Sequence, residues 1–332
     1  MSSGLENLLV KTWHEKNGLS LFLRPFSWLY CFITIVRRMA YRLRFLRSEK
    51  LPVPVIVVGN LTVGGTGKTP LVIYLAELLK SAGYQPGIVS RGYKGKARSW
   101  PQQVRPDSDP VIVGDEAVLI SRRTQCPMAV GPERVAAAKA LLQYHDCDII
   151  ISDDGLQHYA LQRNIEIAVI DGIRRFGNGY CLPAGPLREP LNRLQTVDLM
   201  LTNGTAADNE IAIRYEYDDL LPLHDNTVKQ QLKEFKGQTV HAIAGIGHPQ
   251  RFFYLLREQG LKVIEHSFPD HYYYYESEIE FDDEYPVIMT EKDAVKCFRF
   301  TKKNMWYLPI SLKINDVFDS ELIKLLKSRQ QG

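Results

Sequence analysis

The sequence predicts an α/β fold, in which a parallel sheet carries helices on both faces and is followed by a smaller α/β domain. Short runs of β-branched and aliphatic residues, typical of strands buried in a parallel sheet, alternate along the chain with segments of helical periodicity. The length of 332 residues fits two domains, and 45% hydrophobic with 24% charged residues is the composition of a folded chain. A disordered or collagen-like protein is therefore excluded.

Charge and cysteine content exclude several further classes of protein. Lys and Arg together number 41 and Asp and Glu 38, so the net charge of +3 is too even for a general nucleic-acid binder, and we expect no nucleic acid as a partner. The five cysteines form no C-x-x-C pair and are odd in number. They argue against a disulfide framework or a structural zinc site, and they favour a reducing compartment.

Residues 1–50 are expected to be a membrane-associated helical segment. Residues 19–36 are the most apolar stretch and have about the minimum length of a membrane span, although Arg24 and Pro25 interrupt them. The basic run that follows, between residues 37 and 50, marks the cytoplasmic side and attracts anionic headgroups. We therefore expect a membrane surface as a partner and a cytoplasmic catalytic body. A full span, a helix in one leaflet and a helix packed on the protein body all fit this pattern.

A phosphate-binding loop opens the expected core, residues 51–202. Residues 54–59 are predicted as a buried strand and residues 71–79 as a helix, with the glycine-rich loop NLTVGGTGKT between them, which is the order of a P-loop. In such a loop the lysine contacts the β- and γ-phosphates and the following hydroxyl ligates Mg²⁺. A glycine-rich turn without a ligand is the alternative, and Thr62 replaces the first glycine of the general pattern. The predicted nucleotide-binding residues are Thr62, Val63, Gly64, Gly65, Thr66, Gly67, Lys68 and Thr69.

An acidic pair follows the strand expected at residues 149–151. Asp153 and Asp154 stand at its carboxyl end, and in a parallel sheet that end lies beside the P-loop of a neighbouring strand. We therefore expect one of the two carboxylates to reach the P-loop Mg²⁺, directly or through water. An acidic strand end without a P-loop is more often structural. His158 is as readily structural as functional.

Two segments between these motifs contain charged residues whose role the sequence does not decide. Residues 88–94 are predicted as a strand that enters a basic loop, where Arg91 and Lys94 either meet an anion or are solvated. Residues 111–116 begin a helix, so on spacing alone Asp115 is an ordinary charge near a helix N-terminus.

The loop LPAGPLREP, residues 182–190, is predicted to be rigid because it contains three prolines and a glycine. Residues 203–235 are polar and irregular, and we expect a linker or hairpin there. Residues 236–332 alternate strands and helices, which predicts the smaller α/β domain. The tyrosines at 272–275 either pack alternately in its core or stack on a ligand.

Seven motifs, taken together, resemble one family. NLTVGGTGKTP, SRGYKGK, VGDE, SDDGLQH, LPAGPLREP, FPDHYYY and TEKDAVK occur in this order, from near the apolar N-terminus to about Lys296. The set is similar to the tetraacyldisaccharide 4′-kinases, the lipid A kinases of Gram-negative bacteria. The resemblance implies an ATP- and Mg²⁺-dependent enzyme at the cytoplasmic face of the inner membrane. Its substrate would be a glycolipid, tetraacyldisaccharide 1-phosphate, which it phosphorylates on the 4′-hydroxyl to form lipid IVA.

The resemblance also implies roles that spacing left open. The family's catalytic base is an Asp in G-D-E, assisted by a His in P-D-H, and these positions are Asp115 and His271 here. A carboxylate within hydrogen-bond reach can accept the proton of the attacking hydroxyl, and a histidine bound to it can orient it. Lys68 is the third catalytic residue implied. The implied metal environment consists of Thr69, Asp153, Asp154 and Glu189.

Three other functions compete with a lipid kinase. A P-loop ATPase would turn over ATP without a phosphorylated lipid, and a nucleotide-binding module would not need Asp115. A kinase for a soluble sugar or nucleoside would leave the apolar N-terminus unexplained. Two α/β domains also predict a cleft that closes on the nucleotide and excludes water.

Overall fold

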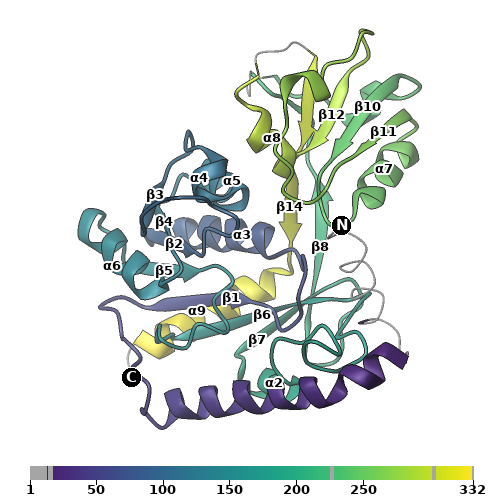
Figure 1. Cartoon of the computed structure of the whole chain (residues 1–332). Helices are drawn as coiled ribbons and strands as arrows, with labels where there is room; N and C mark the ends of the chain where they lie inside the picture. Colours follow the sequence, from purple (N-terminus) through teal and green to yellow (C-terminus); the bar gives the residue numbers. More distant parts are fainter. Residues whose placement is uncertain (1–12, 14–17, 225–227, 301–303, 331–332) are drawn as a thin grey trace.

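The structure is a computed structural model that describes Trp13 and residues 18–224, 228–300 and 304–330. Its larger sheet has nine strands in the order β14-β8-β7-β6-β1-β5-β2-β4-β3 (Figure 1). All neighbours in it are parallel except β3 with β4 and β14 with β8. In chain order the strands are β1 (Val55–Gly59), β2 (Pro86–Ser90), β3 (Gln102–Val104), β4 (Met128–Val130), β5 (Ile149–Ser152), β6 (Ile165–Asp171), β7 (Leu199–Asn203), β8 (Ile211–Tyr217) and β14 (Ile310–Lys313).

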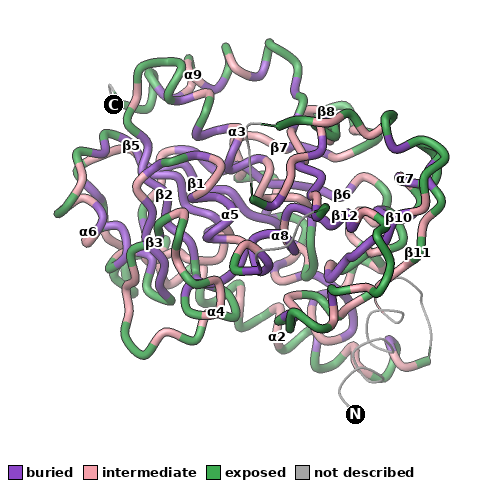
Figure 2. Tube along the Cα trace, turned by 90° about the horizontal axis from the view of Figure 1, so that it is seen from above, coloured by how far each residue is buried: buried purple, intermediate pink, exposed green. Residues whose placement is uncertain are grey.

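Helices cover both faces of this sheet, as predicted. Alternate residues of a strand point to opposite faces, so Ile56 and Val58 of β1 join one apolar cluster and Val55 and Val57 join another. Figure 2 shows the buried residues concentrated in these central strands. The first cluster includes residues of α3 (Lys68–Ser81), α5 (Asp115–Thr124) and α9 (Asp316–Gln330), and the second includes residues of α6 (Arg134–Tyr144). The short α4 (Pro110–Val113) precedes α5.

The smaller domain is built on a five-stranded sheet in the order β11-β10-β12-β13-β9. Its strands are parallel except β9, and α7 and α8 pack on opposite faces. Tyr274 is fully buried, whereas Tyr273 and Tyr275 are exposed, so the tyrosine run packs alternately in the core. The elements are β9 (Leu221–Pro222), β10 (Thr239–Ala244), α7 (Pro249–Glu258), β11 (Lys262–Ser267), β12 (Val287–Thr290), α8 (Glu291–Cys297) and β13 (Met305–Leu308), and short 3₁₀ turns occur at Leu191–Thr196, Leu232–Phe235 and Glu276–Glu278.

The domain boundaries differ from those expected at 203–235 and 236–332. Strand β8, expected within a linker, pairs with β7 and β14 in the larger sheet. Strand β14 and helix α9, expected in the smaller domain, close that sheet and its helical layer, as Figure 1 shows for the yellow helix. The reason is burial: Phe318, Leu322 and Leu326 of α9 pack into the first apolar cluster. The chain therefore passes between the domains twice, after β8 and before β14.

Helix α2 (Gly18–Arg42) lies along the end of the larger domain away from the smaller one (Figure 1). It continues through Pro25, and it is the one described helix long and apolar enough to cross a membrane. One side is fastened to the body, since the Ser27 hydroxyl donates to the Cys181 carbonyl (2.7 Å) and Tyr30 packs against the second cluster. Residues 1–12 and 14–17 of the expected N-terminal segment lie outside the described residues. The other side of α2 is apolar and exposed, through Leu21, Phe22, Phe26, Trp28, Leu29, Phe32, Ile33 and Val36.

Replacing Leu322 with alanine tests whether α9 belongs to the core. Leu322 is fully buried, so the lost contacts and the cavity should lower the free energy of unfolding by about 2–5 kcal/mol. Urea unfolding followed by circular dichroism measures the change. The control is Val317→Ala on the same helix, whose side chain is exposed and should cost less than about 0.5 kcal/mol. A Leu322→Ala variant as stable as the control would contradict the packing.

Candidate active site

The phosphate-binding loop joins β1 to the N-terminus of α3. Gly67 precedes the helix in a left-handed conformation (φ 79°, ψ 32°), which a glycine adopts at little cost. A Cβ atom on it would lie 1.7 Å from the Tyr215 hydroxyl oxygen, so the backbone needs glycine for space as well. The first N–H groups of α3 have no partner within a helix and attract anions. The buried Thr66 hydroxyl also has no hydrogen-bond partner, as expected of a cradle for a ligand.

The rigid loop of residues 182–190 packs directly on the P-loop. Thr62 and Leu187 form an antiparallel bridge, and the Val63 N–H donates to the Pro186 carbonyl (2.8 Å). Thr62, which replaces a glycine of the general pattern, therefore has extended backbone in this chain and requires no left-handed conformation. The Lys68 ammonium is held by the Asn60 side-chain oxygen (3.1 Å) and by Asp154 (3.3 Å).

The acidic pair stands at the end of β5, which is parallel to β1, as predicted. One Asp153 oxygen accepts a hydrogen bond from Ser90 (2.9 Å), while the other is buried without a partner. Burial and the charge of Asp154 raise the pKa of Asp153 to about 6. Burial alone would raise the pKa of Asp154 too, but Lys68 and Arg188 outweigh it and lower this pKa to about 2. The pair thus includes one buried carboxylate oxygen that has no hydrogen-bond partner among the described residues.

These groups fit Mg²⁺. The unpartnered Asp153 oxygen and the hydroxyl of Thr69 are hard oxygen donors, which Mg²⁺ prefers. Among the described residues, no three His, Cys, Asp or Glu side chains gather into a metal cage. That agrees with Mg²⁺ held by one or two carboxylates together with phosphate oxygens and water.

Glu189, expected near the metal, is buried in a network of its own. One of its oxygens accepts the hydroxyl of Tyr159, and the other lies 3.5 Å from Arg193 Nε. Arg193 in turn pairs with Glu166. The second Glu189 oxygen is buried and accepts no hydrogen bond from the described residues, as is also true of the unpartnered Asp153 oxygen.

Asp115 and His271 meet between the domains. They are 156 positions apart in the sequence, yet His271 Nδ1 lies 2.8 and 2.9 Å from the two Asp115 oxygens. The Asp115 side chain is buried, and that of His271 is 9% exposed. Asp115 is the first residue of α5, and His271 lies in the loop after β11. Burial would raise the pKa of Asp115, but the His271 hydrogen bond and the Lys292 charge outweigh it and lower this pKa. The carboxylate is therefore ionised at neutral pH.

The start of α5 also faces the acidic pair. Glu116, next to Asp115, is close enough to contribute to the raised pKa of Asp153. The P-loop, the acidic pair and the Asp115–His271 pair are thus parts of one site. Sequence reasoning gave no role to two of its side chains, Asn60 and Ser90, although each begins a recognised motif. It placed Lys292 at a helix start that lines the cleft, without its contact to His271.

Basic side chains surround His158 and line the loop after β2, whose roles the sequence left open. Burial and the charges of nearby arginines, Arg134 first among them, lower the pKa of His158 to about 4, so it is neutral at physiological pH. A hollow of about 270 Å³ beyond the P-loop is lined by Arg91, Gly92, Tyr93, Lys94, Trp100 and Pro132.

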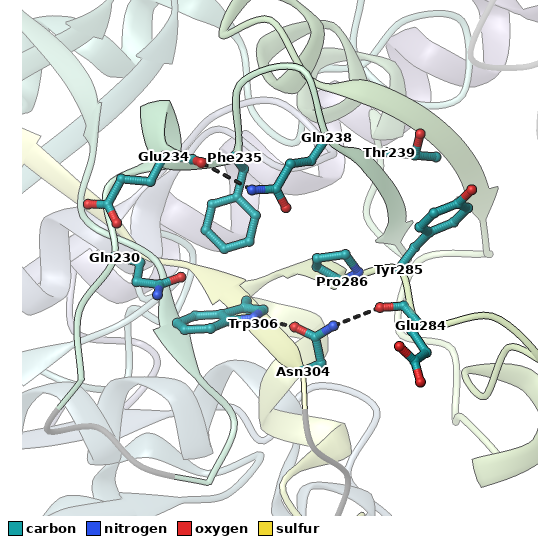
Figure 3. Close-up of a pocket in the computed structure, with 10 residues that line it drawn as sticks. All are labelled: Gln230, Glu234, Phe235, Gln238, Thr239, Glu284, Tyr285, Pro286, Asn304 and Trp306. Atoms are coloured by element: carbon teal, nitrogen blue, oxygen red, sulfur yellow. Dashed lines mark hydrogen bonds between the residues drawn. The ribbon is translucent and has the colours of Figure 1, made fainter.

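A cavity of about 620 Å³ lies in the smaller domain, at the amino ends of β10, β12 and β13 (Figure 3). None of its lining residues belongs to the site described above. Its polar groups bind one another: Gln238 donates to the Glu234 carbonyl (3.2 Å), and Asn304 donates to the Glu284 carbonyl (3.0 Å) and accepts from Trp306 (3.3 Å). We assign it no ligand.

A P-loop with an adjacent acidic pair and a buried carboxylate–histidine pair defines a P-loop phosphotransferase. The model of the family described as tetraacyldisaccharide-1-P 4′-kinase matches residues 19–327. The chain therefore belongs to the tetraacyldisaccharide 4′-kinase family, and it is a kinase of lipid A biosynthesis.

Individual relatives agree with this assignment. A tetraacyldisaccharide 4′-kinase of Nitrosococcus oceani is 51% identical over 325 residues, 98% of this chain and 96% of that one. One of Methylobacillus flagellatus is 49% identical over 328 residues, 98% of either chain. Among solved structures, "apo" form LpxK from Aquifex aeolicus in complex with ATP is similar, with a TM-score of 0.79 and 29% identity over 93% of this chain and 99% of that one. The family resemblance of the seven motifs is confirmed.

Replacing Gly67 with alanine should damage the phosphate loop. The left-handed backbone and the clash with Tyr215 should lower the free energy of unfolding by about 1–3 kcal/mol and weaken nucleotide binding. Thermal unfolding and displacement of a fluorescent ATP analogue measure the two effects. Gly247→Ala is the control, because nothing lies within 4 Å of its added Cβ. Parent-like nucleotide affinity in Gly67→Ala would contradict the role of this glycine.

Proposed function

We propose that this kinase transfers the γ-phosphate of ATP to the 4′-hydroxyl of tetraacyldisaccharide 1-phosphate, forming lipid IVA, with Asp115 as the base. The contact between Asp115 and His271 carries the proposal, because it supplies an ionised, oriented carboxylate next to a phosphate-binding loop. The hydroxyl oxygen attacks the γ-phosphorus as the bond to the β–γ bridging oxygen breaks. Asp115 takes the hydroxyl proton late in the reaction, and ADP leaves.

The P-loop residues 62–69 would bind the ATP phosphates through backbone N–H groups, and Lys68 would stabilise the charge that develops on the transferred group. Thr69 and Asp153 would hold Mg²⁺, with Asp154 near enough to contribute through water. Glu189 would contribute through its second carboxylate oxygen, which accepts no hydrogen bond from the described residues and lies 3.5 Å from Arg193. When bound there, Mg²⁺ would supply positive charge that neutralises the phosphates during transfer.

We infer that α2 lies in one leaflet of the cytoplasmic face of the inner membrane. Its Ser27 side is bonded to the body, and its other side is a continuous apolar surface. A helix fastened lengthwise to the body would have to detach in order to span the bilayer. Arg37, Arg38 and Arg42 at its end would attract anionic headgroups, so the acyl chains of the substrate can stay in the membrane.

The transfer of labelled γ-phosphate from ATP to tetraacyldisaccharide 1-phosphate in detergent micelles tests the function. We expect labelled lipid from the parent and a loss of kcat by about 10²–10⁴-fold in Asp115→Asn, with little change in the KM for ATP, because that carboxylate acts on the acceptor proton. Lys68→Ala, which loses charge stabilisation, is the inactive control.

Two results would contradict the proposal. ATP hydrolysis without labelled lipid would favour an ATPase. A large loss of ATP affinity in Asp115→Asn would make Asp115 a ligand of the metal–nucleotide complex rather than the base.

Charges on the exposed face of α2 should abolish membrane binding. The side chains of Phe22, Trp28 and Phe32 are 71%, 66% and 63% exposed, so the triple change to glutamate should leave the fold intact. It should weaken co-sedimentation with anionic vesicles by at least about tenfold, because each buried aromatic ring contributes a transfer free energy of about 1.5–3 kcal/mol. The control is Tyr254→Glu on α7, whose side chain is also exposed. Undiminished sedimentation of the triple variant would contradict the assignment.

A further inference from the structure

Lys292 is the one cation in direct contact with the distal nitrogen of His271 among the described residues. It lies in the first turn of α8, which Thr290 caps by accepting from the Asp293 N–H. Its ammonium nitrogen is 3.3 Å from His271 Nε2, 3.0 Å from a Glu116 oxygen and 3.1 Å from an Asp270 oxygen. The side chain is 17% exposed. The ammonium is thus largely enclosed between the two domains.

The hydrogen-bonding capacity of these groups favours one state of His271. An ammonium has only donors, so its contact with Nε2 requires a lone pair on that nitrogen. The imidazole proton is then on Nδ1, where it donates to the Asp115 carboxylate. A doubly protonated ring would instead place an N–H against the ammonium.

Charges of both signs surround the ring, and Lys292 opposes the carboxylates. Asp115 and Glu116 face it from α5, and Asp270 lies 3.6 Å from Nε2 in its own loop. Lys94, which donates to the Asp270 carbonyl, and the ring of Tyr93 approach from the loop after β2. Lys296 of α8 adds a second positive charge near Asp115. Without Lys292, the nearby carboxylates would favour an imidazolium.

We propose that Lys292 is a positioning residue that holds His271 neutral, with its proton on Nδ1 and directed at Asp115. This inference rests on the proposed function, in which Asp115 is the base. A neutral donor orients the carboxylate and leaves it more able to accept a proton than an imidazolium partner would. Because Lys292 and His271 belong to the smaller domain while Asp115 and Glu116 belong to the larger one, the base is correctly oriented only when the domains are docked.

The state of His271 is measured directly by NMR of the full chain in micelles with ¹⁵N-labelled histidine. The chain has eight histidines, and His271→Asn identifies the resonance. We expect a protonated Nδ1 and an unprotonated Nε2 at pH 7 in the parent. In Lys292→Met we expect a proton on Nε2 as well at pH 7, because a positive charge that opposed it is gone. Lys292→Arg, which keeps the charge, should restore the parent state.

The pH dependence of transfer supplies the second readout. The acid limb of kcat should move to higher pH by about one unit in Lys292→Met, with an unchanged KM for ATP, and should return in Lys292→Arg. Glu116→Gln breaks the same ion pair between domains but keeps Lys292 beside His271, so its acid limb should stay or move to lower pH. If the Lys292–Glu116 ion pair only held the domains together, Lys292→Met and Glu116→Gln would lower kcat equally, and the acid limb of the kcat–pH profile would not move.

Two outcomes would overturn the proposal: a proton on Nε2 in the parent at pH 7, or an Nε2 that stays unprotonated in Lys292→Met. Thermal unfolding of each variant shows that it is folded before the comparison. The NMR measurement needs neither ATP nor lipid, so it judges Lys292 even if the chain fails to phosphorylate the glycolipid. Failure of transfer in the parent would instead reject the proposed function.

Discussion

The hydrogen bond between His271 and Asp115 is the interaction on which the site depends, because its partners come from different domains. It lies in an interface where opposite charges meet: Lys292 contacts Glu116 (3.0 Å), and Arg123 contacts Glu291 (2.9 Å). Buried charges are tolerated only when they are paired and hydrogen-bonded. The interface therefore has few alternative arrangements, and the arrangement that satisfies its charges also orients the carboxylate.

The P-loop is tied to the connection between the domains. The chain passes between them along β8 and before β14, and these strands pair with each other. Tyr215 of β8 places its hydroxyl against the carbonyl groups of Thr66 (3.3 Å) and Gly67 (3.1 Å). Closure of the domains on nucleotide stays a prediction. A change at the phosphate loop would act directly on one of the two strands through which such a movement must pass.

One loop also links the phosphate site to the apolar helix α2. The Ser27 hydroxyl of α2 and the Trp13 indole bind the carbonyl groups of Cys181 and Pro183. A few residues later the same loop pairs with the P-loop, where the Arg188 N–H donates to the Leu61 carbonyl (2.6 Å). Helix α2 and the phosphate-binding loop thus share one support. This arrangement suits a kinase whose acceptor is a lipid.

The sequence by itself determined the local elements and the parts of the site that are local. The buried strands, the P-loop between β1 and α3 and the acidic pair after β5 follow from periodicity and short spacing, because neighbouring residues decide them. It did not determine that β8, β14 and α9 complete the larger domain, since the partners that bury Leu322 are distant in the chain. Nor did it reveal that Lys292 touches His271 or that Tyr159 and Arg193 engage Glu189. Such contacts form between residues that are distant in the sequence, because buried charged groups are paired when the chain folds. Sequence spacing does not indicate which residues will meet.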